Sequence, residues 1–233
     1  MVVALIEGIL EKEFLIGTTY IWEFDPEVPV DWLLWLKAVP SKLKNGHGVL
    51  VDSFGDLVDI KINEVQKMAS GEDKSIFLES LDKINIIKIG GHPSRFGNLL
   101  GILDPSEVGT KYNRLFKQVA NRYKRVFNIV YNLEGHLLEE GEEAILEWYK
   151  ILIGLEGKLG KTSVYLIPRN VIDDKYMRLF KNSVGGVISS EYLGGGIYSL
   201  EIRKTQIIEH LGLEILWKIN NYGNVEIVDT KTP

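Results

Sequence analysis

The sequence has 233 residues, 45% of them hydrophobic and none of them cysteine, and its formal net charge is -5. This length and apolar content suit one sizeable core and are short for two full α/β domains. The absence of cysteine excludes disulfides, thiolate zinc sites and cysteine nucleophiles. The negative charge argues against a protein that binds nucleic acid over its whole surface.

No stretch approaches the roughly 20 apolar residues of a membrane span. The apolar start carries Glu7 and lacks the basic region of a signal peptide. Glutamine is scarce while isoleucine, lysine and glutamate are abundant, a bias typical of proteins from hot environments. We therefore expect a cytoplasmic protein with no membrane partner.

Helical and strand patterns alternate over the first 170 residues, and apolar periodicity separates the two. In chain order the predicted segments are helix Val2–Glu13, strand Thr18–Phe24, loop Asp25–Val30, a helix from Asp31 to Asn45-Gly46, strand Gly48–Phe54, helix Asp56–Ala69, strand Ile84–Ile89, loop Gly90–Asn98, helix Asp104–Tyr123, strand Val126–Asn132, helix Glu142–Leu155 and strand Ser163–Pro168. Strands joined by helices of this length predict right-handed βαβ units and a parallel sheet.

Two local signals refine this prediction. Asp31 suits the N-cap of its helix, and Pro40 should kink that helix before Asn45-Gly46 ends it. Val126–Asn132 is continuously apolar and β-branched except for its asparagines, as expected of a strand buried on both faces. It ends in Asn132 at the carboxyl edge, where open α/β sheets bind ligands.

The pattern changes after residue 184. Four strand-like runs joined by Gly or Asn turns follow: Gly186–Tyr192, Ile197–Lys204, Leu213–Asn220 and Asn224–Val228. Short links of this kind suit antiparallel pairs, and Gly194-Gly195-Gly196 reads as a hairpin turn. Without a linker or composition break, we predict one α/β domain over residues 1–233, mainly parallel with antiparallel C-terminal strands.

Gly154–Thr162, Gly-Leu-Glu-Gly-Lys-Leu-Gly-Lys-Thr, resembles a phosphate-binding P-loop at first sight. The spacing Gly-x4-Gly-Lys-Ser/Thr would need glycine where Leu155 stands. A P-loop also runs from a strand into a helix, whereas this segment leaves a helix and enters a strand. We interpret it as a helix C-cap and turn.

Two further groups have simple structural explanations. His136 with Glu139 and Glu140 has helical ligand spacing but no third ligand, so an acidic helix start is preferred and no metal site is predicted. Dense basic residues follow one helix face and form a candidate partner surface: Lys111, Arg114, Lys117, Arg122 and Arg125. A solvated helix face explains them most simply; a protein partner or a nucleic-acid backbone are the alternatives.

The order of elements from Thr18 to Val228 resembles the RecA/KaiC branch of P-loop ATPases. Val51–Asp56 is similar to the end of the strand that carries the catalytic carboxylates, and Val126–Asn132 to the strand that carries the Mg²⁺ aspartate. Ile197–Thr205 resembles a later strand that presents a lysine, here Lys204, towards a neighbouring subunit. The chain also resembles an uncharacterised family of hyperthermophilic archaea. The resemblance implies a RecA-like three-layer αβα fold.

The departures from this family all fall on its chemistry. After Phe24 the chain reads Asp-Pro-Glu-Val-Pro-Val-Asp, without the glycines and lysine of a P-loop. The prolines remove backbone donors, and the acidic residues repel phosphate. Asn132 replaces the Mg²⁺ aspartate, and Gly55 and Asp56 replace the catalytic glutamates. Because phosphoryl transfer depends on these groups for positioning and charge, we expect ATP hydrolysis to be lost and no cofactor to be used.

We therefore expect a non-catalytic domain that binds a protein, an extended peptide or, by self-association, a second copy of the chain, for example at an edge of the sheet near the C-terminal strands. Tight binding of nucleic acid is not expected. The residues expected at the degenerate nucleotide cleft are Phe24, Asp25, Trp32, Asp52, Asp56, Asn132, Glu134 and Lys204.

The alternative is an enzyme or a nucleotide or ligand sensor that uses the same cleft with different groups, including Glu23. The state of the cleft separates the two hypotheses. A binding module should have it filled by Trp32 or Phe24, whereas an enzyme or sensor should keep an open pocket with carboxylates of shifted pKa.

Overall fold

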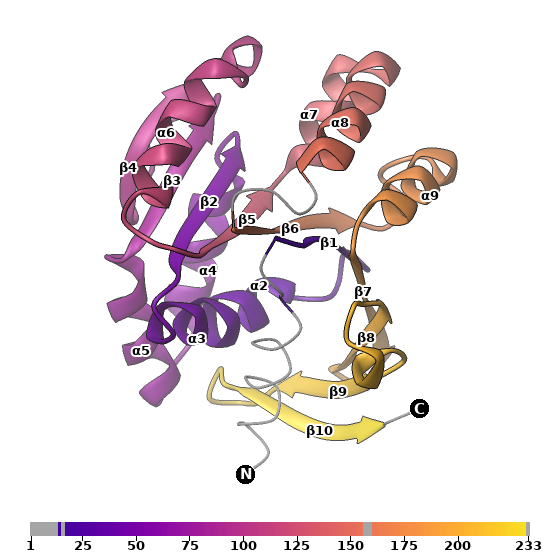
Figure 1. Cartoon of the computed structure of the whole chain (residues 1–233). Helices are drawn as coiled ribbons and strands as arrows, with labels where there is room; N and C mark the ends of the chain where they lie inside the picture. The colour runs from indigo at the N-terminus through magenta and orange to yellow at the C-terminus, as the bar shows by residue number, and fades with distance from the viewer. Residues whose placement is uncertain (1–13, 15–16, 156–159, 232–233) are drawn as a thin grey trace.

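The computed structural model describes residue 14, residues 17–155 and residues 160–231. The predicted helix Val2–Glu13 lies outside the described residues. The strands are β1 Thr19–Phe24, β2 Gly48–Phe54, β3 Ile84–Ile89, β4 Asn98–Leu103, β5 Val126–Tyr131, β6 Lys161–Pro168, β7 Gly186–Gly194, β8 Ile197–Lys204, β9 Glu214–Ile219 and β10 Val225–Lys231. They form one ten-stranded sheet in the order β10-β9-β8-β7-β1-β6-β5-β2-β3-β4 (Figure 1).

The sheet is parallel from β4 to β7, and β7 to β10 pair antiparallel. This confirms the predicted division into a parallel core and an antiparallel extension. Val126–Tyr131 is buried at every position, as its apolar run predicts. The hairpin between β7 and β8 turns at Gly194, Gly195 and Gly196, whose φ angles are all positive, which favours glycine.

Helices cover both faces of the parallel part. The elements between the strands are α2 Val30–Leu33, π-helical η1 Leu34–Ala38, α3 Val39–Lys44, α4 Leu57–Met68, α5 Gly71–Leu81, η2 Pro105–Glu107, α6 Thr110–Ala120, α7 Leu133–Glu140, α8 Glu142–Leu155, α9 Asp174–Ser183 and η3 Ile208–His210. The apolar side chains of α2 to α5 join one core cluster, and those of α6 to α9 join a second on the opposite face. The result is a three-layer α/β arrangement.

The direction in which the chain moves along the sheet explains why the helices divide between its two faces. The chain passes from β1 to β2, β3 and β4 in one direction along the sheet, then returns through β5, β6 and β7 in the other. Right-handed crossovers place the connecting helices of these two legs on opposite faces.

Several local predictions need correction. Asp31 is not an N-cap: α2 begins at Val30, and the N-cap position is Pro29. The predicted kink at Pro40 falls where the π-helical turn η1 passes into α3, in which Pro40 is the second residue. A wider π turn accommodates the missing proline N–H. The run then ends at Lys44, with Gly46 at φ 75°, as predicted.

Three α-helices and one strand were not predicted: α5, α7, α9 and β4. β4 begins at the end of the predicted loop Gly90–Asn98; its sequence is short and apolar, is interrupted by Gly101, and is only partly buried. α9 has a strongly amphipathic sequence but directly precedes the change of pattern at residue 184. The predicted helix Asp104–Tyr123 is shorter, with a capped 3₁₀ turn at Asp104 followed by α6.

None of the helices in the described part of the chain is long and apolar enough to cross a membrane.

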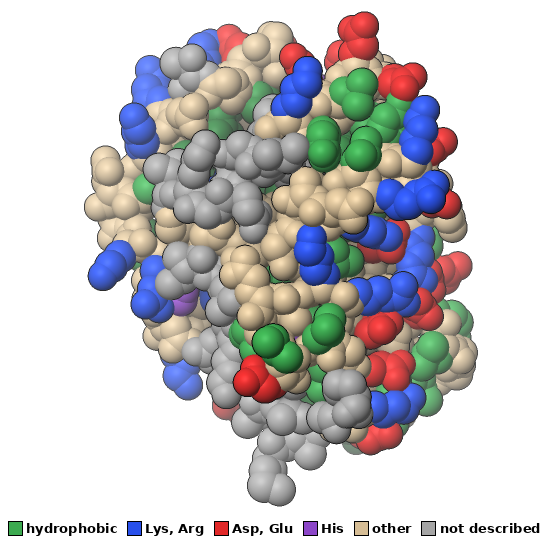
Figure 2. Space-filling view, turned by 45° about the vertical axis from the view of Figure 1, so that its right-hand side comes forward, with side chains coloured by type: hydrophobic (Ala, Val, Ile, Leu, Met, Phe, Trp, Pro, Cys, Tyr) green, Lys and Arg blue, Asp and Glu red, His purple; other side chains and the backbone are tan. Residues whose placement is uncertain are grey.

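The antiparallel extension is rich in ion pairs. On the face seen in Figure 2, basic and acidic side chains are interspersed and do not form separate patches. Arg203 pairs with Glu191 at 3.1 Å, and Lys231 of β10 pairs with Glu214 of β9 at 2.9 Å. The register of β10 on β9 shifts between Ile227 and Asp229, which marks a bulge or irregularity.

Candidate functional site

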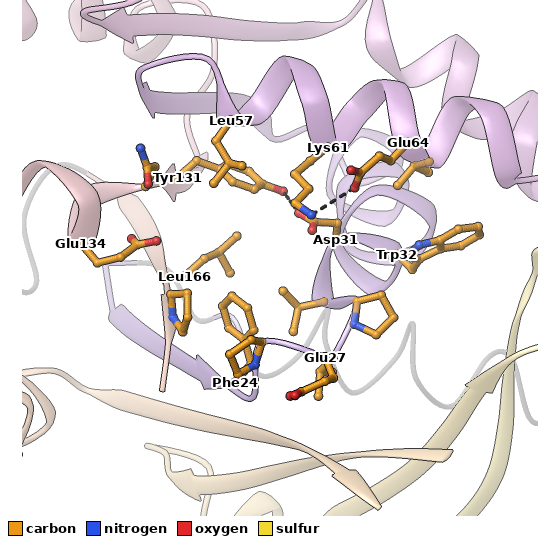
Figure 3. A pocket seen from close by; sticks show the side chains of 17 residues that line it. Phe24, Glu27, Asp31, Trp32, Leu57, Lys61, Glu64, Tyr131, Glu134 and Leu166 are labelled. Carbon is orange, nitrogen blue, oxygen red and sulfur yellow. Dashed lines mark hydrogen bonds and ion pairs between the residues drawn. The ribbon is translucent and has the colours of Figure 1, made fainter. Parts of the chain in front are cut away.

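A cavity opens at the carboxyl ends of the central parallel strands. There β1 leads into α2 on one face of the sheet, while β5 and β6 lead towards α7 and α9 on the other. Such a change of direction leaves a crevice in open α/β sheets. The cavity has a volume of about 300 Å³. Its walls come from the end of β1 with the following loop, α2, α4, the end of β5 with the start of α7, and β6 (Figure 3).

Asp31 and Tyr131 form a buried pair in this wall. Asp31 follows the proline loop, and Tyr131 is the last residue of β5; their exposed fractions are 9% and 2%. The Tyr131 hydroxyl donates a hydrogen bond to Asp31 Oδ1 at 2.7 Å. Burial raises the pKa of Asp31, and the Tyr131 hydrogen bond opposes this shift. Burial and the nearby Asp31 carboxylate raise the pKa of Tyr131 well above its ordinary value.

The position of Tyr131 follows from packing on the helical face. Its ring stacks on Trp35 of η1, with ring centroids 6.2 Å apart and an interplanar angle of 10°. Trp35 in turn packs edge-on against Phe77 of α5. These aromatic contacts hold the Tyr131 hydroxyl at the start of α2, where Asp31 lies.

Glu134 faces the cavity from the opposite side. It is the second residue of α7, and Figure 3 shows its carboxyl group directed into the open space. Only 6% of the residue is exposed, and its Oε2 atom has no hydrogen-bond partner. Burial raises the pKa of Glu134 from 4.5 to about 7. A hydrogen bond from the backbone of Glu134 to its own carboxyl group lowers the pKa, but not enough to offset burial.

Lys61 and Glu64 occupy the α4 side of the cavity. Lys61 Nζ lies 3.0 Å from Glu64 Oε2, and both side chains are partly exposed. The lining contains four carboxyl residues, Glu27, Asp31, Glu64 and Glu134, against the single ammonium group of Lys61. The cavity is therefore acidic, with apolar walls that include Phe24, Trp32 and Leu166.

Asn132 has a structural reason for its identity. Its φ and ψ are 59° and 28°, in the left-handed region that asparagine tolerates better than most residues. This conformation starts α7 immediately after β5. The side-chain amide of Asn132 donates to the carbonyl oxygen of Phe54 at 3.1 Å, which joins the ends of β5 and β2.

The cavity brings together four of the residues predicted for the degenerate cleft: Phe24, Trp32, Asn132 and Glu134. Phe24 and Trp32 form walls and leave the space open. The other four, Asp25, Asp52, Asp56 and Lys204, do not line this cavity.

Asp25 and Lys204 hold the antiparallel extension to the core. Arg169 Nη1 lies 2.9 Å from Asp25 Oδ1, and the backbone N–H of Tyr192 donates to Asp25 Oδ2 at 3.1 Å. Lys204 donates to the carbonyl oxygens of Lys181 and Asn182 at 3.0 and 3.1 Å. Lys204 therefore caps the end of α9 in this chain, an interaction typical of lysine at a helix C-terminus.

Asp56 belongs to a cluster beside α4. It accepts hydrogen bonds from Lys88 Nζ at 2.9 Å and from the backbone N–H of His92 at 2.8 Å, and its Oδ2 lies 2.7 Å from His92 Nδ1. The hydrogen bonds from His92 lower the pKa of Asp56 most, and the bond from Lys88 lowers it further. Lys88 is fully buried and also binds Asp59 at 3.0 Å. The cluster ties the loop after β3 to the start of α4.

Asp52 lies in a separate buried network with α6. Its Oδ2 accepts hydrogen bonds from Tyr112 at 2.7 Å and Asn128 at 2.9 Å. Lys161 donates to the Tyr112 hydroxyl at 2.7 Å and lies 3.9 Å from Asp52. Asp52, Tyr112 and Lys161 line a mostly apolar cavity of about 220 Å³, which is also lined by Trp148.

This network also accounts for the end of the P-loop-like segment. Lys161 is the first residue of β6, at the amino end of a strand, so it lies away from the carboxyl edge. Gly160 has a φ of 61°, consistent with the predicted turn, and residues 156–159 lie outside the described part.

The predicted basic surface is exposed on and after α6. Lys111, Arg114, Lys117, Arg122 and Arg125 are all exposed, while Leu115, Phe116 and Val119 face the core. Lys111 forms an ion pair with Glu107 of η2. No group of three histidine, aspartate or glutamate side chains among the described residues is placed to hold a metal ion.

The sequence interpretation missed four groups of the cavity. Tyr131 was taken only as part of a buried strand, and Asp31 as a cap. Lys61 and Glu64 were taken as the polar side of a helix. The spacing of Leu57, Lys61 and Glu64 places all three on one face of α4. Only the tertiary structure shows that α4 packs against α2.

No protein-family model matches the sequence. No curated protein matches it either. Among solved structures, the chain is similar to a protein from Pyrococcus horikoshii OT3 known from a structural study, with a TM-score of 0.72 and 19% identity. The alignment covers 88% of this chain and 95% of that protein. At this identity the likeness shows a shared fold, here an α/β fold also found in an archaeal protein.

Proposed function

We propose that this chain is a RecA/KaiC-like domain that has lost triphosphate hydrolysis and binds a different small ligand at the carboxyl edge of its sheet. The order of elements supports the comparison with that superfamily: β1 leads to the loop where a P-loop would stand, β2 leads to Asp56, and β5 leads to Asn132. Antiparallel strands close the sheet, as in that group.

The observation that carries this proposal is the open cavity into which the buried carboxyl group of Glu134 is directed, with its Oε2 atom unpartnered (Figure 3). A buried polar group without a partner is costly, and natural proteins keep few of them. Concave sites with apolar walls and a few convergent polar groups are the usual form of ligand pockets. An open cavity with carboxyl groups of raised pKa favours the sensor or enzyme alternative over a cleft closed by its own side chains.

The same walls disfavour a nucleoside triphosphate. Pro26 and Pro29 provide no backbone N–H, and Glu27, Asp31 and Glu134 place negative charge where phosphates would lie. The lining offers Lys61 alone as a cation, and Glu64 already pairs with it at 3.0 Å.

Calorimetric titration with Mg²⁺ and ATP tests this part of the proposal. We expect no heat of binding up to millimolar nucleotide. A micromolar dissociation constant, equivalent to about -8 kcal/mol, would overturn it. A fragment screen observed through the indole N–H resonance of Trp32 tests the cavity itself; Trp32→Phe assigns that resonance.

A second candidate function is the binding of an extended partner segment, and the structure favours β4 over the C-terminal strands as its site. β10, one terminal strand of the described sheet, has a register shift and carries Glu226, Asp229 and Lys231, features that discourage edge pairing. β4, the other terminal strand, has no charged residue, and its Ile102 is 43% exposed.

The exposed basic residues of α6 lie beside this edge, because α6 packs on β4 and β3. An acidic extended segment would suit both features. Hydrogen exchange of β4 in the presence of a co-purified partner tests this candidate; unchanged exchange of β4 in such a complex would contradict it.

A further inference from the structure

We propose that the cavity between α2, α4 and α7 binds an organic cation, specifically a primary ammonium group carried on an apolar body, and that Glu134 is its counterion. This inference rests on the proposed ligand-binding function and specifies the class of ligand. It follows from the charges, partners and wall chemistry of the cavity.

The acidic groups of the cavity differ in how open they are to a ligand. Asp31 already accepts the Tyr131 hydroxyl at 2.7 Å, and Glu64 already pairs with Lys61 at 3.0 Å. Glu27 is exposed at the mouth. Glu134 differs from these groups because it is 6% exposed and its Oε2 has no partner. An ammonium group would supply both the missing hydrogen bond and the missing positive charge.

Charged and polar groups from several elements surround Glu134 across the cavity. The groups facing the cavity are Asp31 from α2, Lys61 and Glu64 from α4, Tyr131 from β5, and Glu27 from the loop after β1. The Lys61 ammonium lies on the opposite side of the cavity from Glu134, beside Asp31 and Glu64 (Figure 3). One cation thus faces four carboxyl groups, so the cavity favours a positively charged ligand over a neutral or negative one.

The walls of the cavity suit an apolar body on the ligand. Phe24, Trp32, Tyr131 and Leu166 provide aromatic and apolar walls. Such walls bury hydrocarbon, and aromatic faces attract ammonium groups. A divalent metal ion fits less well, because Mg²⁺ and Ca²⁺ need several oxygen ligands at once, while a single unpartnered carboxylate is offered. A volume of about 300 Å³ suits a small aromatic amine.

The experiment compares three probes of nearly equal shape: 2-phenylethylamine, 2-phenylethanol and 3-phenylpropionate. Each is titrated into the full chain at pH 8, where the Glu134 carboxyl is ionised, and followed by the Trp32 indole resonance and by calorimetry. Because a hydrogen bond to a charged group contributes enough for roughly a tenfold effect, we expect the amine to bind at least about tenfold more tightly than the alcohol.

The variant Glu134→Gln removes the charge and keeps the shape. It should reduce the affinity for the amine by roughly tenfold and leave affinity for the alcohol unchanged. Glu139→Gln is the matched control, since Glu139 is exposed on the same helix α7. It should bind all three probes like the parent chain. Circular dichroism checks that each variant is folded.

The outcomes separate this inference from the proposed function. If the alcohol or the propionate shifts the Trp32 resonance at equal or lower concentration than the amine, the cavity binds ligands but the inferred charge class is wrong. Equal affinity of the amine for the parent chain and Glu134→Gln also overturns the role of Glu134. If neither these probes nor the fragment screen shifts that resonance, the proposed ligand site itself is wrong.

Discussion

The substitution Glu134→Gln should change how the stability of the ligand-free protein depends on pH. Burial raises the pKa of Glu134 from 4.5 to about 7 in the folded protein. Between these values the folded state holds a proton that the unfolded state has released. Stability must therefore fall as the pH rises from about 4.5 through 7, because ionisation of the buried carboxyl is unfavourable.

The magnitude follows from the two pKa values. Their difference corresponds to a loss of about 3 kcal/mol in unfolding free energy above pH 7. Below pH 4.5 this loss is absent. The Gln variant has no carboxyl group at this position and lacks this loss. The stability of the variant relative to the parent chain should therefore increase by up to about 3 kcal/mol between pH 4.5 and pH 8. The raised pKa of Asp31 acts in both proteins and largely cancels in the comparison.

Guanidinium unfolding of both proteins at half-unit steps from pH 4.5 to 8.5 measures this difference. Glu139→Gln is the control and should follow the parent chain, because its carboxyl is exposed. Parallel stability curves for the parent and Glu134→Gln would refute the reasoning, since they would mean that the carboxyl titrates alike in folded and unfolded states. The same dependence predicts weaker binding of an amine below pH 7, where Glu134 is protonated.

Three further substitutions test the contacts around the two cavities. Tyr131→Phe removes the hydrogen bond to buried Asp31, so it should cost about 1–3 kcal/mol of stability in denaturant unfolding and raise the pKa of Asp31 further. Asn132→Asp replaces an amide donor by an acceptor against the Phe54 carbonyl, so it should also lower stability by about 1–3 kcal/mol. A Mg²⁺-dependent recovery of the melting temperature of this variant would contradict the structural role of Asn132. Lys161→Met leaves the carboxylate of Asp52 without its cation, so calorimetric melting should show a loss of about 3–5 kcal/mol, whereas replacing the exposed lysine at position 117 should change little.

The local pattern of the chain determined its secondary structure where one signal dominated. The unbroken apolar run of β5 requires a strand covered on both faces, and this is what the sheet provides. The Gly-rich turn of the β7–β8 hairpin follows from the need for positive φ angles. The change from helical crossovers to short turns likewise determined where the parallel sheet becomes antiparallel. The absence of P-loop glycines and lysine after Phe24 is also a property of the sequence alone.

The contents of the cavity depended on tertiary structure. Asp52 lies in β2 near the carboxyl edge, yet successive strand residues point to opposite faces, and Asp52 points to the α6 side, whereas the cavity walls include α2 and α4 on the other face. Asp31 suited a helix cap by residue type, but the hydroxyl of Tyr131, 100 positions away in the sequence, makes it a buried acceptor. No local pattern encodes that contact, because the order of the strands in the sheet brings β5 beside the helix that follows β1. The burial of Glu134 is likewise a result of packing, and its Oε2 atom has no hydrogen-bond partner among the described residues.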